Sequence, residues 1–122
     1  MNKPVRFGVI SASPMAESHM TAIRDNADAV LTAVCDIDLE KARRAAAKFQ
    51  LPPERVFADY HELLALQDVD AVVICTPDST HLAYACRAAA LGKPVLLEKP
   101  LGLRFAAPGQ LEQLLAAPAP VM

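Results

Sequence analysis

The chain has 122 residues, a formal net charge of −2, 53% hydrophobic and 21% charged residues, four Phe, two Tyr and no Trp. This length and composition predict one globular domain rather than a disordered segment, and the near-neutral charge with few aromatics excludes a nucleic-acid-binding surface. No apolar run reaches about 18 residues, so no membrane span is expected, and the first residues lack a signal-peptide pattern.

Short apolar runs alternate with longer amphipathic stretches, beginning with a predicted strand at residues 5–10. A turn at 11–14 and a helix from about 15 to 26 follow, and a second strand is expected at 29–35. Asp38 is placed to cap the next helix, which has one apolar face and ends before the prolines at 52–53. The first half of the chain therefore predicts a strand–helix–strand–helix order.

The second half continues the alternation. A short strand at 55–57 precedes a short helix that Asp59 caps, and a buried strand is expected at 71–75. The next helix ends at Gly92, before a strand at 95–97 and a last helix at about 108–116. Residues 120–122 resemble the start of a sixth strand.

The predicted strands are apolar along their length instead of alternating apolar with polar residues. Strands buried on both faces have this pattern, and strand–helix alternation favours a parallel sheet with right-handed crossovers. The fold class predicted is α/β, a doubly wound and mainly parallel sheet of the Rossmann type, over residues 1–122. Ligands bind such sheets beyond the carboxyl ends of the strands, so the residues that follow each strand are the candidates.

The first turn stands where a dinucleotide-binding fingerprint belongs. Residues 11–16 (Ser-Ala-Ser-Pro-Met-Ala) align with G-x-G-x-x-G/A in a strand–turn–helix context. Ser11 and Ser13 replace the first two glycines, and Ser13 with Pro14 also makes a good helix start. Two interpretations stay open here, a working phosphate loop and a plain helix cap.

Asp36 ends the second predicted strand at the distance from the loop that the dinucleotide interpretation requires. Its carboxylate suits the hydroxyls of an adenosine ribose and repels a 2′-phosphate, and Ile37 beside it offers no positive charge. These two residues favour NAD over NADP. The alternative is that Asp36 only caps a turn.

Two more segments follow predicted strands. Thr76-Pro77-Asp78-Ser79-Thr80-His81 comes after the fourth strand, and Glu98-Lys99-Pro100 comes after the fifth. His81 is expected either to contact a cofactor or substrate or to be simply solvated. Lys99 is expected either beside a nicotinamide and a substrate hydroxyl or at the surface next to a turn proline.

Together these segments resemble the N-terminal half of the Gfo/Idh/MocA oxidoreductases, the glucose–fructose oxidoreductase and inositol dehydrogenase family. The motifs that carry the resemblance are Thr-Pro-x-x-x-His at 76–81 and Gly-Lys-Pro-Val-Leu-Leu-Glu-Lys-Pro-Leu at 92–101. The resemblance implies an NAD- or NADP-binding Rossmann domain that serves hydride exchange with a sugar or polyol carbon. It implies catalytic roles for Lys99 and His81 at the nicotinamide. The implied cofactor-binding residues are Gly8, Ser11, Ala12, Ser13, Pro14, Met15, Asp36, Ile37, Cys75, Thr76, Pro77, Asp78, His81, Glu98, Lys99 and Pro100.

The family's C-terminal substrate domain is expected to be absent, with the sheet cut short near its sixth strand. We therefore expect a dinucleotide-binding module with little turnover, which acts on a sugar or polyol only if a second domain is supplied. An open sheet edge also favours a homo-oligomer. The alternative is a Rossmann-like scaffold for assembly or regulation that has lost dinucleotide binding.

The three cysteines, at 35, 75 and 86, show no CxxC or Cys/His metal spacing, so no metal site is expected. They follow apolar strands or lie on an apolar helix face, which predicts buried and inert thiols. Reduced thiols and the lack of a signal sequence predict a cytoplasmic protein.

Overall fold

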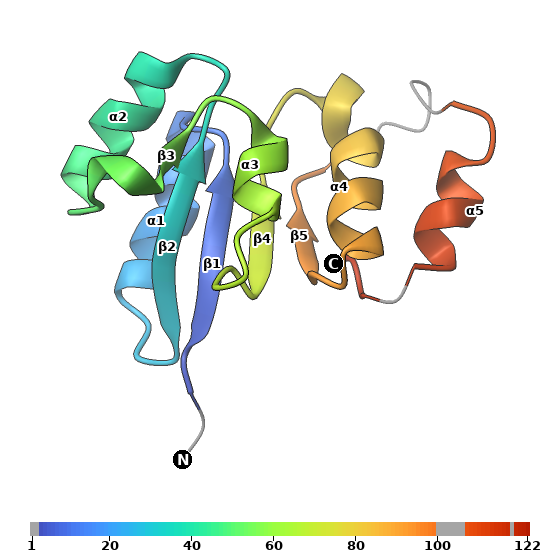
Figure 1. Ribbon diagram of the computed structural model, residues 1–122, viewed down its shortest axis with the longest axis horizontal. Helices are drawn as coiled ribbons and strands as arrows, with labels where there is room; N and C mark the ends of the chain where they lie inside the picture. Colours follow the sequence, from blue (N-terminus) through green and yellow to red (C-terminus); the bar gives the residue numbers. More distant parts are fainter. Residues whose placement is uncertain (1–2, 100–106, 118) are drawn as a thin grey trace.

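The computed structural model describes residues 3–99, 107–117 and 119–122. Its centre is a five-stranded sheet in the order β3-β2-β1-β4-β5, and every strand pair is parallel (Figure 1). The strands are β1 (Val5–Ile10), β2 (Ala29–Cys35), β3 (Val56–Phe57), β4 (Ala71–Ile74) and β5 (Val95–Leu97). The predicted fold class, a doubly wound parallel sheet of the Rossmann type, is confirmed.

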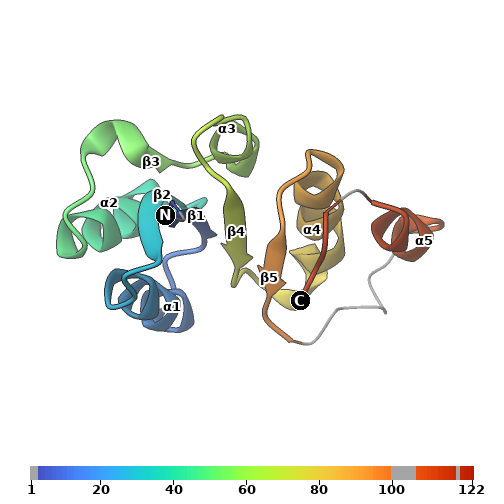
Figure 2. The same ribbon diagram turned by 90° about the horizontal axis from the view of Figure 1, so that it is seen from below.

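Helices cover both faces of the sheet. They are α1 (Pro14–Arg24), α2 (Leu39–Lys48), α3 (Tyr60–Leu64), α4 (His81–Ala90) and α5 (Gln110–Leu115), with short 3-10 helices η1 (Pro53–Arg55) and η2 (Asp78–Thr80). One buried cluster joins α1 and α2 to the sheet, and a second joins α3 and α4 to its opposite face. Figure 2 shows these two layers, with α5 packed outside α4. In the described residues, no helix is both long and apolar enough to cross a lipid bilayer.

Side-chain caps set where the helices begin. The Ser13 hydroxyl accepts a hydrogen bond from the Ala16 N–H, so α1 begins at Pro14, one residue before the predicted start. Asp38 caps α2 and Asp59 caps α3, as the sequence predicts. Two strand boundaries differ slightly, because residue 55 belongs to η1 and residue 75 follows the last paired residue of β4.

Gly8 lies in the middle of β1, beneath α3. A Cβ at this position would come within 2.7 Å of Leu63 Cδ2 and 3.2 Å of Val69 Cγ1. The missing side chain therefore lets the apolar face of α3 pack directly on the strand. That packing holds β1, and with it the turn that follows, close against α3.

Residues 120–122 add a short pairing to the outer edge of β5. Val121 forms an isolated parallel bridge with Val95, and Met122 N–H donates to the Val95 carbonyl at 2.7 Å. This segment takes the place in the sheet that a sixth strand would occupy, so the predicted strand start is confirmed as a single bridge.

Candidate functional site

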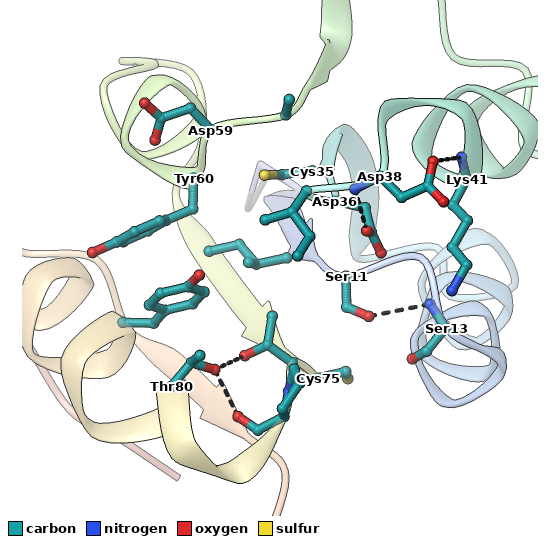
Figure 3. Close-up of a pocket in the computed structure, with 16 residues that line it drawn as sticks. Ser11, Ser13, Cys35, Asp36, Asp38, Lys41, Asp59, Tyr60, Cys75 and Thr80 are labelled. Atoms are coloured by element: carbon teal, nitrogen blue, oxygen red, sulfur yellow. Dashed lines mark hydrogen bonds between the residues drawn. The ribbon is translucent and has the colours of Figure 1, made fainter. Parts of the chain in front are cut away.

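The carboxyl ends of the parallel strands meet at one edge of the sheet, where a pocket of about 800 Å³ opens. Figure 3 shows its lining from the ends of β1, β2 and β4 and from the starts of the helices that follow. The lining residues are Ile10, Ser11, Ser13, Cys35, Asp36, Ile37, Asp38, Lys41, Ala58, Asp59, Tyr60, Cys75, Thr76, Pro77, Thr80 and Tyr84. The structure thus brings together predicted candidates that lie far apart in the sequence.

The turn after β1 keeps a glycine-like backbone without glycine. Ser11 has a φ of 124°, which side-chain-bearing residues rarely adopt, and its N–H donates to the Cys35 carbonyl at 2.7 Å. The Ser11 Oγ accepts from Ser13 N–H at 3.1 Å, and the Ser13 Oγ accepts from Ala16 N–H at 3.2 Å. The two serines therefore use two N–H groups at the start of α1. Among the N–H groups of this turn, all in the described part of the chain, only that of Met15 has no acceptor.

Asp36 ties the end of β2 to this turn. Its Oδ2 accepts the Ala12 N–H at 2.8 Å and its Oδ1 accepts the Asp38 N–H at 2.8 Å. A carboxylate has about four lone-pair positions, so each oxygen retains acceptor capacity. Asp36 therefore closes a turn. Its carboxylate also lines the pocket, where it can still accept hydrogen bonds from a polar ligand.

Aromatic side chains form a wall of the pocket that the sequence analysis missed. The rings of Tyr60 in α3 and Tyr84 in α4 stack, with centroids 3.9 Å apart and planes at 20°. Ile37 also lines the pocket and has 86% of its surface exposed. These surfaces suit a flat, apolar ring. Nothing in the local sequence pairs residues 60 and 84, because α3 and α4 meet only in the fold.

Lys41 was also missed. Figure 3 shows its side chain extending from α2 toward Ser13. It lines both the main pocket and a neighbouring hollow of about 270 Å³ that Arg44 and Lys48 share. Positions 41, 44 and 48 recur at helical spacing, so the sequence did carry a signal for one basic face of this helix. This face brings positive charge next to the start of α1.

The segment after β4 forms a compact turn. His81 is 2% exposed, and its Nε2 lies 2.7 Å from the Thr76 carbonyl oxygen. Because a carbonyl only accepts, Nε2 carries the proton in this contact. The hydroxyls of Thr76 and Thr80 are 2.6 Å apart and complete the turn. Thr76 and Pro77 line the pocket, whereas His81 lies beneath them and is not part of the lining.

The segment after β5 lies outside the main pocket. The Glu98 carboxylate accepts a hydrogen bond from His19 Nε2 at 2.8 Å, which lowers the pKa of Glu98. Lys99 is exposed and borders a groove of about 720 Å³ along α5 and residues 119–122. Pro100 lies outside the described residues. The remaining candidates, Gly8, Ala12, Pro14, Met15 and Asp78, do not line the main pocket.

Cys35 and Cys86 are buried as predicted, whereas Cys75 is only partly buried. Burial raises the pKa of Cys35 to about 12 and, with Glu98 as the second cause, raises the pKa of Cys75 to about 11. Burial also raises the pKa of Cys86. Thiols with raised pKa values are poor nucleophiles at neutral pH, which argues against redox catalysis by these residues.

Known proteins are similar to this chain in sequence and fold. An inositol 2-dehydrogenase from Burkholderia cenocepacia is 38% identical over 100 residues, which cover 81% of this chain and 29% of that protein. Myo-inositol dehydrogenase from Lactobacillus casei, solved in complex with NAD(H) and myo-inositol, has a TM-score of 0.84 and 30% identity, over 97% of this chain and 36% of that one. A 3-ketoreductase from Actinomadura kijaniata, solved with NADP, has a TM-score of 0.80 and 32% identity, over 95% of this chain and 36% of that one.

The chain therefore spans about a third of the length of the proteins that it resembles. A family model described as "Oxidoreductase family, NAD-binding Rossmann fold" matches residues 5–118, nearly the whole chain. Because it combines the Rossmann topology, a pocket at the strand ends and this family match, the chain belongs to the Gfo/Idh/MocA oxidoreductase family, as its NAD-binding Rossmann domain.

Proposed function

We propose that this chain is the cofactor-binding domain of an NAD-dependent oxidoreductase that acts on a hydroxyl-bearing carbon of a sugar or polyol. The observation that carries the proposal is Asp36, fixed by two backbone N–H groups and facing a pocket that joins the turn after β1 to the end of β2. Similarity to an inositol 2-dehydrogenase supports the substrate class.

The donor set fits a dinucleotide. Asp36 would accept hydrogen bonds from the adenosine ribose hydroxyls, and the wall of Tyr60 and Tyr84 with Ile37 would cover the adenine. The start of α1 beside Ser13 and the Lys41 ammonium would hold the diphosphate. The Asp36 charge repels a 2′-phosphate, so NAD is proposed over NADP.

The nicotinamide end is proposed to lie toward the segments after β4 and β5. Bound there, the nicotinamide supplies the hydride-transfer chemistry. Lys99 would hold the substrate hydroxyl and, in its neutral amine form, would take up the hydroxyl proton. His81 would act as a positioning residue, because its Nε2 holds the Thr76 carbonyl and so shapes the turn that lines the pocket. We expect little turnover from these residues alone.

A second candidate function rests on the serines of the first turn. Ser11 and Ser13 already satisfy two of the N–H groups that a glycine-rich loop leaves to a phosphate. A domain with this turn would suit a scaffold for assembly or regulation that no longer binds a dinucleotide.

Calorimetric titrations with NAD, NADH and NADPH distinguish dinucleotide binding from the scaffold function. We expect micromolar NADH binding and weaker NADPH binding by the unaltered chain. Asp36→Asn removes a carboxylate acceptor for the ribose hydroxyls, so it should weaken NADH binding about tenfold. It also removes the charge that opposes a 2′-phosphate, so it should narrow the difference between the NADH and NADPH affinities. Asp25→Asn, at the exposed end of α1, is the matched control and should change neither affinity.

The double variant Ser11→Gly/Ser13→Gly tests the scaffold alternative directly. Freeing two N–H groups for a phosphate should raise NADH affinity by about tenfold or more if the site binds a dinucleotide. Absence of heat at millimolar ligand, from both the unaltered chain and this variant, would overturn the proposal and favour the scaffold.

A further inference from the structure

Three side chains from separate elements converge beside the main pocket. His19 lies on α1, Cys75 directly follows β4, and Glu98 directly follows β5. Their ligand atoms, an imidazole nitrogen, the thiol sulfur and a carboxylate oxygen, all lie within 4.8 Å of one another. All three residues are partly buried, so the group is sheltered and still within reach of solvent.

We propose that His19, Cys75 and Glu98 form a binding site for a zinc ion. One nitrogen, one sulfur and one oxygen donor make the borderline-soft set that Zn²⁺ takes in preference to Mg²⁺ or Ca²⁺. Three protein ligands leave the fourth tetrahedral position to water or to a ligand. Cys75 also lines the main pocket, so this fourth position is expected to face it.

The spacing needs only small side-chain movements. Bonds of about 2.0–2.3 Å at tetrahedral angles separate ligand atoms by roughly 3.3–3.8 Å. His19 Nε2 and Glu98 Oε1 are 2.8 Å apart around a shared proton and would separate slightly as the ion replaces it. From the 4.8 Å limit, the Cys75 sulfur must approach the other two ligand atoms by about 1.0–1.5 Å at most. Rotations about the side-chain bonds of His19 and Glu98 cover such distances.

The proton balance is simple. Starting from the neutral ring, His19 moves its proton from Nε2 to Nδ1 and presents the Nε2 lone pair to the ion, without net release. The Cys75 thiol loses one proton to solvent and binds as thiolate, since a metal ion displaces the proton of a coordinating thiol. The Glu98 carboxylate binds as it stands. Binding one ion therefore releases one proton, and no oxidant or reductant is involved.

The test is a titration of the reduced, metal-free chain with Co²⁺, which fills tetrahedral zinc sites and gives visible absorption, followed by displacement with Zn²⁺. We expect one equivalent to bind at micromolar concentration with a thiolate-to-cobalt charge-transfer band, and Zn²⁺ to remove that band. Cys75→Ser should abolish the band and weaken Zn²⁺ binding at least about tenfold. His19→Gln should weaken it similarly.

Two matched variants serve as controls. Cys86→Ser removes a thiol that lies on α4, and His61→Gln removes an exposed imidazole on α3; both should leave affinity and spectrum unchanged. Glu98→Gln, directly after β5, is a third ligand variant. It replaces Cys75→Ser if circular dichroism shows that Cys75→Ser does not fold. Binding weaker than millimolar, a missing charge-transfer band, or a band that follows Cys86 would overturn the proposal. This test is independent of dinucleotide binding.

Discussion

At the scale of single residues, Ser11 shows a conflict between side chain and backbone. Its φ of 124° belongs to the region that favours glycine, and its side chain is almost fully buried. A residue held in such a conformation costs about 1–3 kcal/mol. The hydrogen bond from Ser13 N–H to its Oγ offsets part of that cost, which explains how a serine is accommodated in the tight turn.

Two substitutions at this position separate strain from hydrogen bonding. Ser11→Ala and Ser11→Gly both lose the hydroxyl, but only the alanine keeps a Cβ at positive φ. We expect Ser11→Ala to lower the free energy of unfolding by about 1 kcal/mol. We expect Ser11→Gly to be about 1 kcal/mol more stable than Ser11→Ala. Urea unfolding measures both, and equal midpoints for the two variants would contradict a strained turn.

At the scale of elements, an ion pair joins the starts of β1 and β4. The Arg6 guanidinium donates to both oxygens of Asp70 at 2.9 and 3.0 Å, and the Arg6 N–H donates to Asp70 Oδ2 at 2.9 Å. These hydrogen bonds, led by the one from the guanidinium, lower the pKa of Asp70 to about 2. The pair is partly exposed, so solvent screening keeps its contribution to stability modest.

The direction of this pKa shift predicts acid sensitivity. Because the folded-state pKa lies below the unfolded value of about 3.9, the contribution is complete above about pH 4 and is lost as pH falls toward 2. Asp70→Asn should therefore lower the urea midpoint at pH about 5 more than at pH about 2.5. Arg6→Gln is the control that removes the donor. A constant difference across this pH range would contradict the assignment.

At the scale of the whole molecule, β5 depends on residues distant in sequence. The Val95 N–H donates to the Pro120 carbonyl at 2.9 Å, and the Leu97 N–H donates to the Met122 carbonyl at 2.7 Å. Together with the bond from Met122 N–H to the Val95 carbonyl, these contacts pair the outward-facing backbone groups of β5. The strand that leads into Glu98 and Lys99 is thus hydrogen-bonded on both sides.

Deleting residues 120–122 should loosen this edge. We expect a loss of about 2 kcal/mol in the free energy of unfolding, since three edge hydrogen bonds disappear. Amide hydrogen exchange should show faster exchange at Val95 and Leu97. The Cys75 amide, which donates to the Ile10 carbonyl, is the internal control and should keep its protection. Unchanged exchange at Val95 and Leu97 would contradict a structural role for this segment.

The sequence by itself determined the fold class and most of the elements. Apolar runs such as residues 71–75 specify strands buried on both faces, and local caps such as Asp38 and Asp59 set helix starts, because both signals depend on near neighbours. The edge where ligand-facing residues gather follows from the parallel order alone. Asp36, Thr76 and Pro77 were found in this way, and all three line the pocket.

Only the tertiary structure decided which side chains meet. It stacked Tyr60 on Tyr84, turned Lys41 toward Ser13, and placed His81 beneath the pocket rather than in its lining. It also gathered His19, Cys75 and Glu98 into a donor cluster that no cysteine spacing indicates. The physical reason is that these contacts join elements separated by long stretches of chain, and their distances depend on how the helices pack on the sheet, which local sequence patterns do not encode.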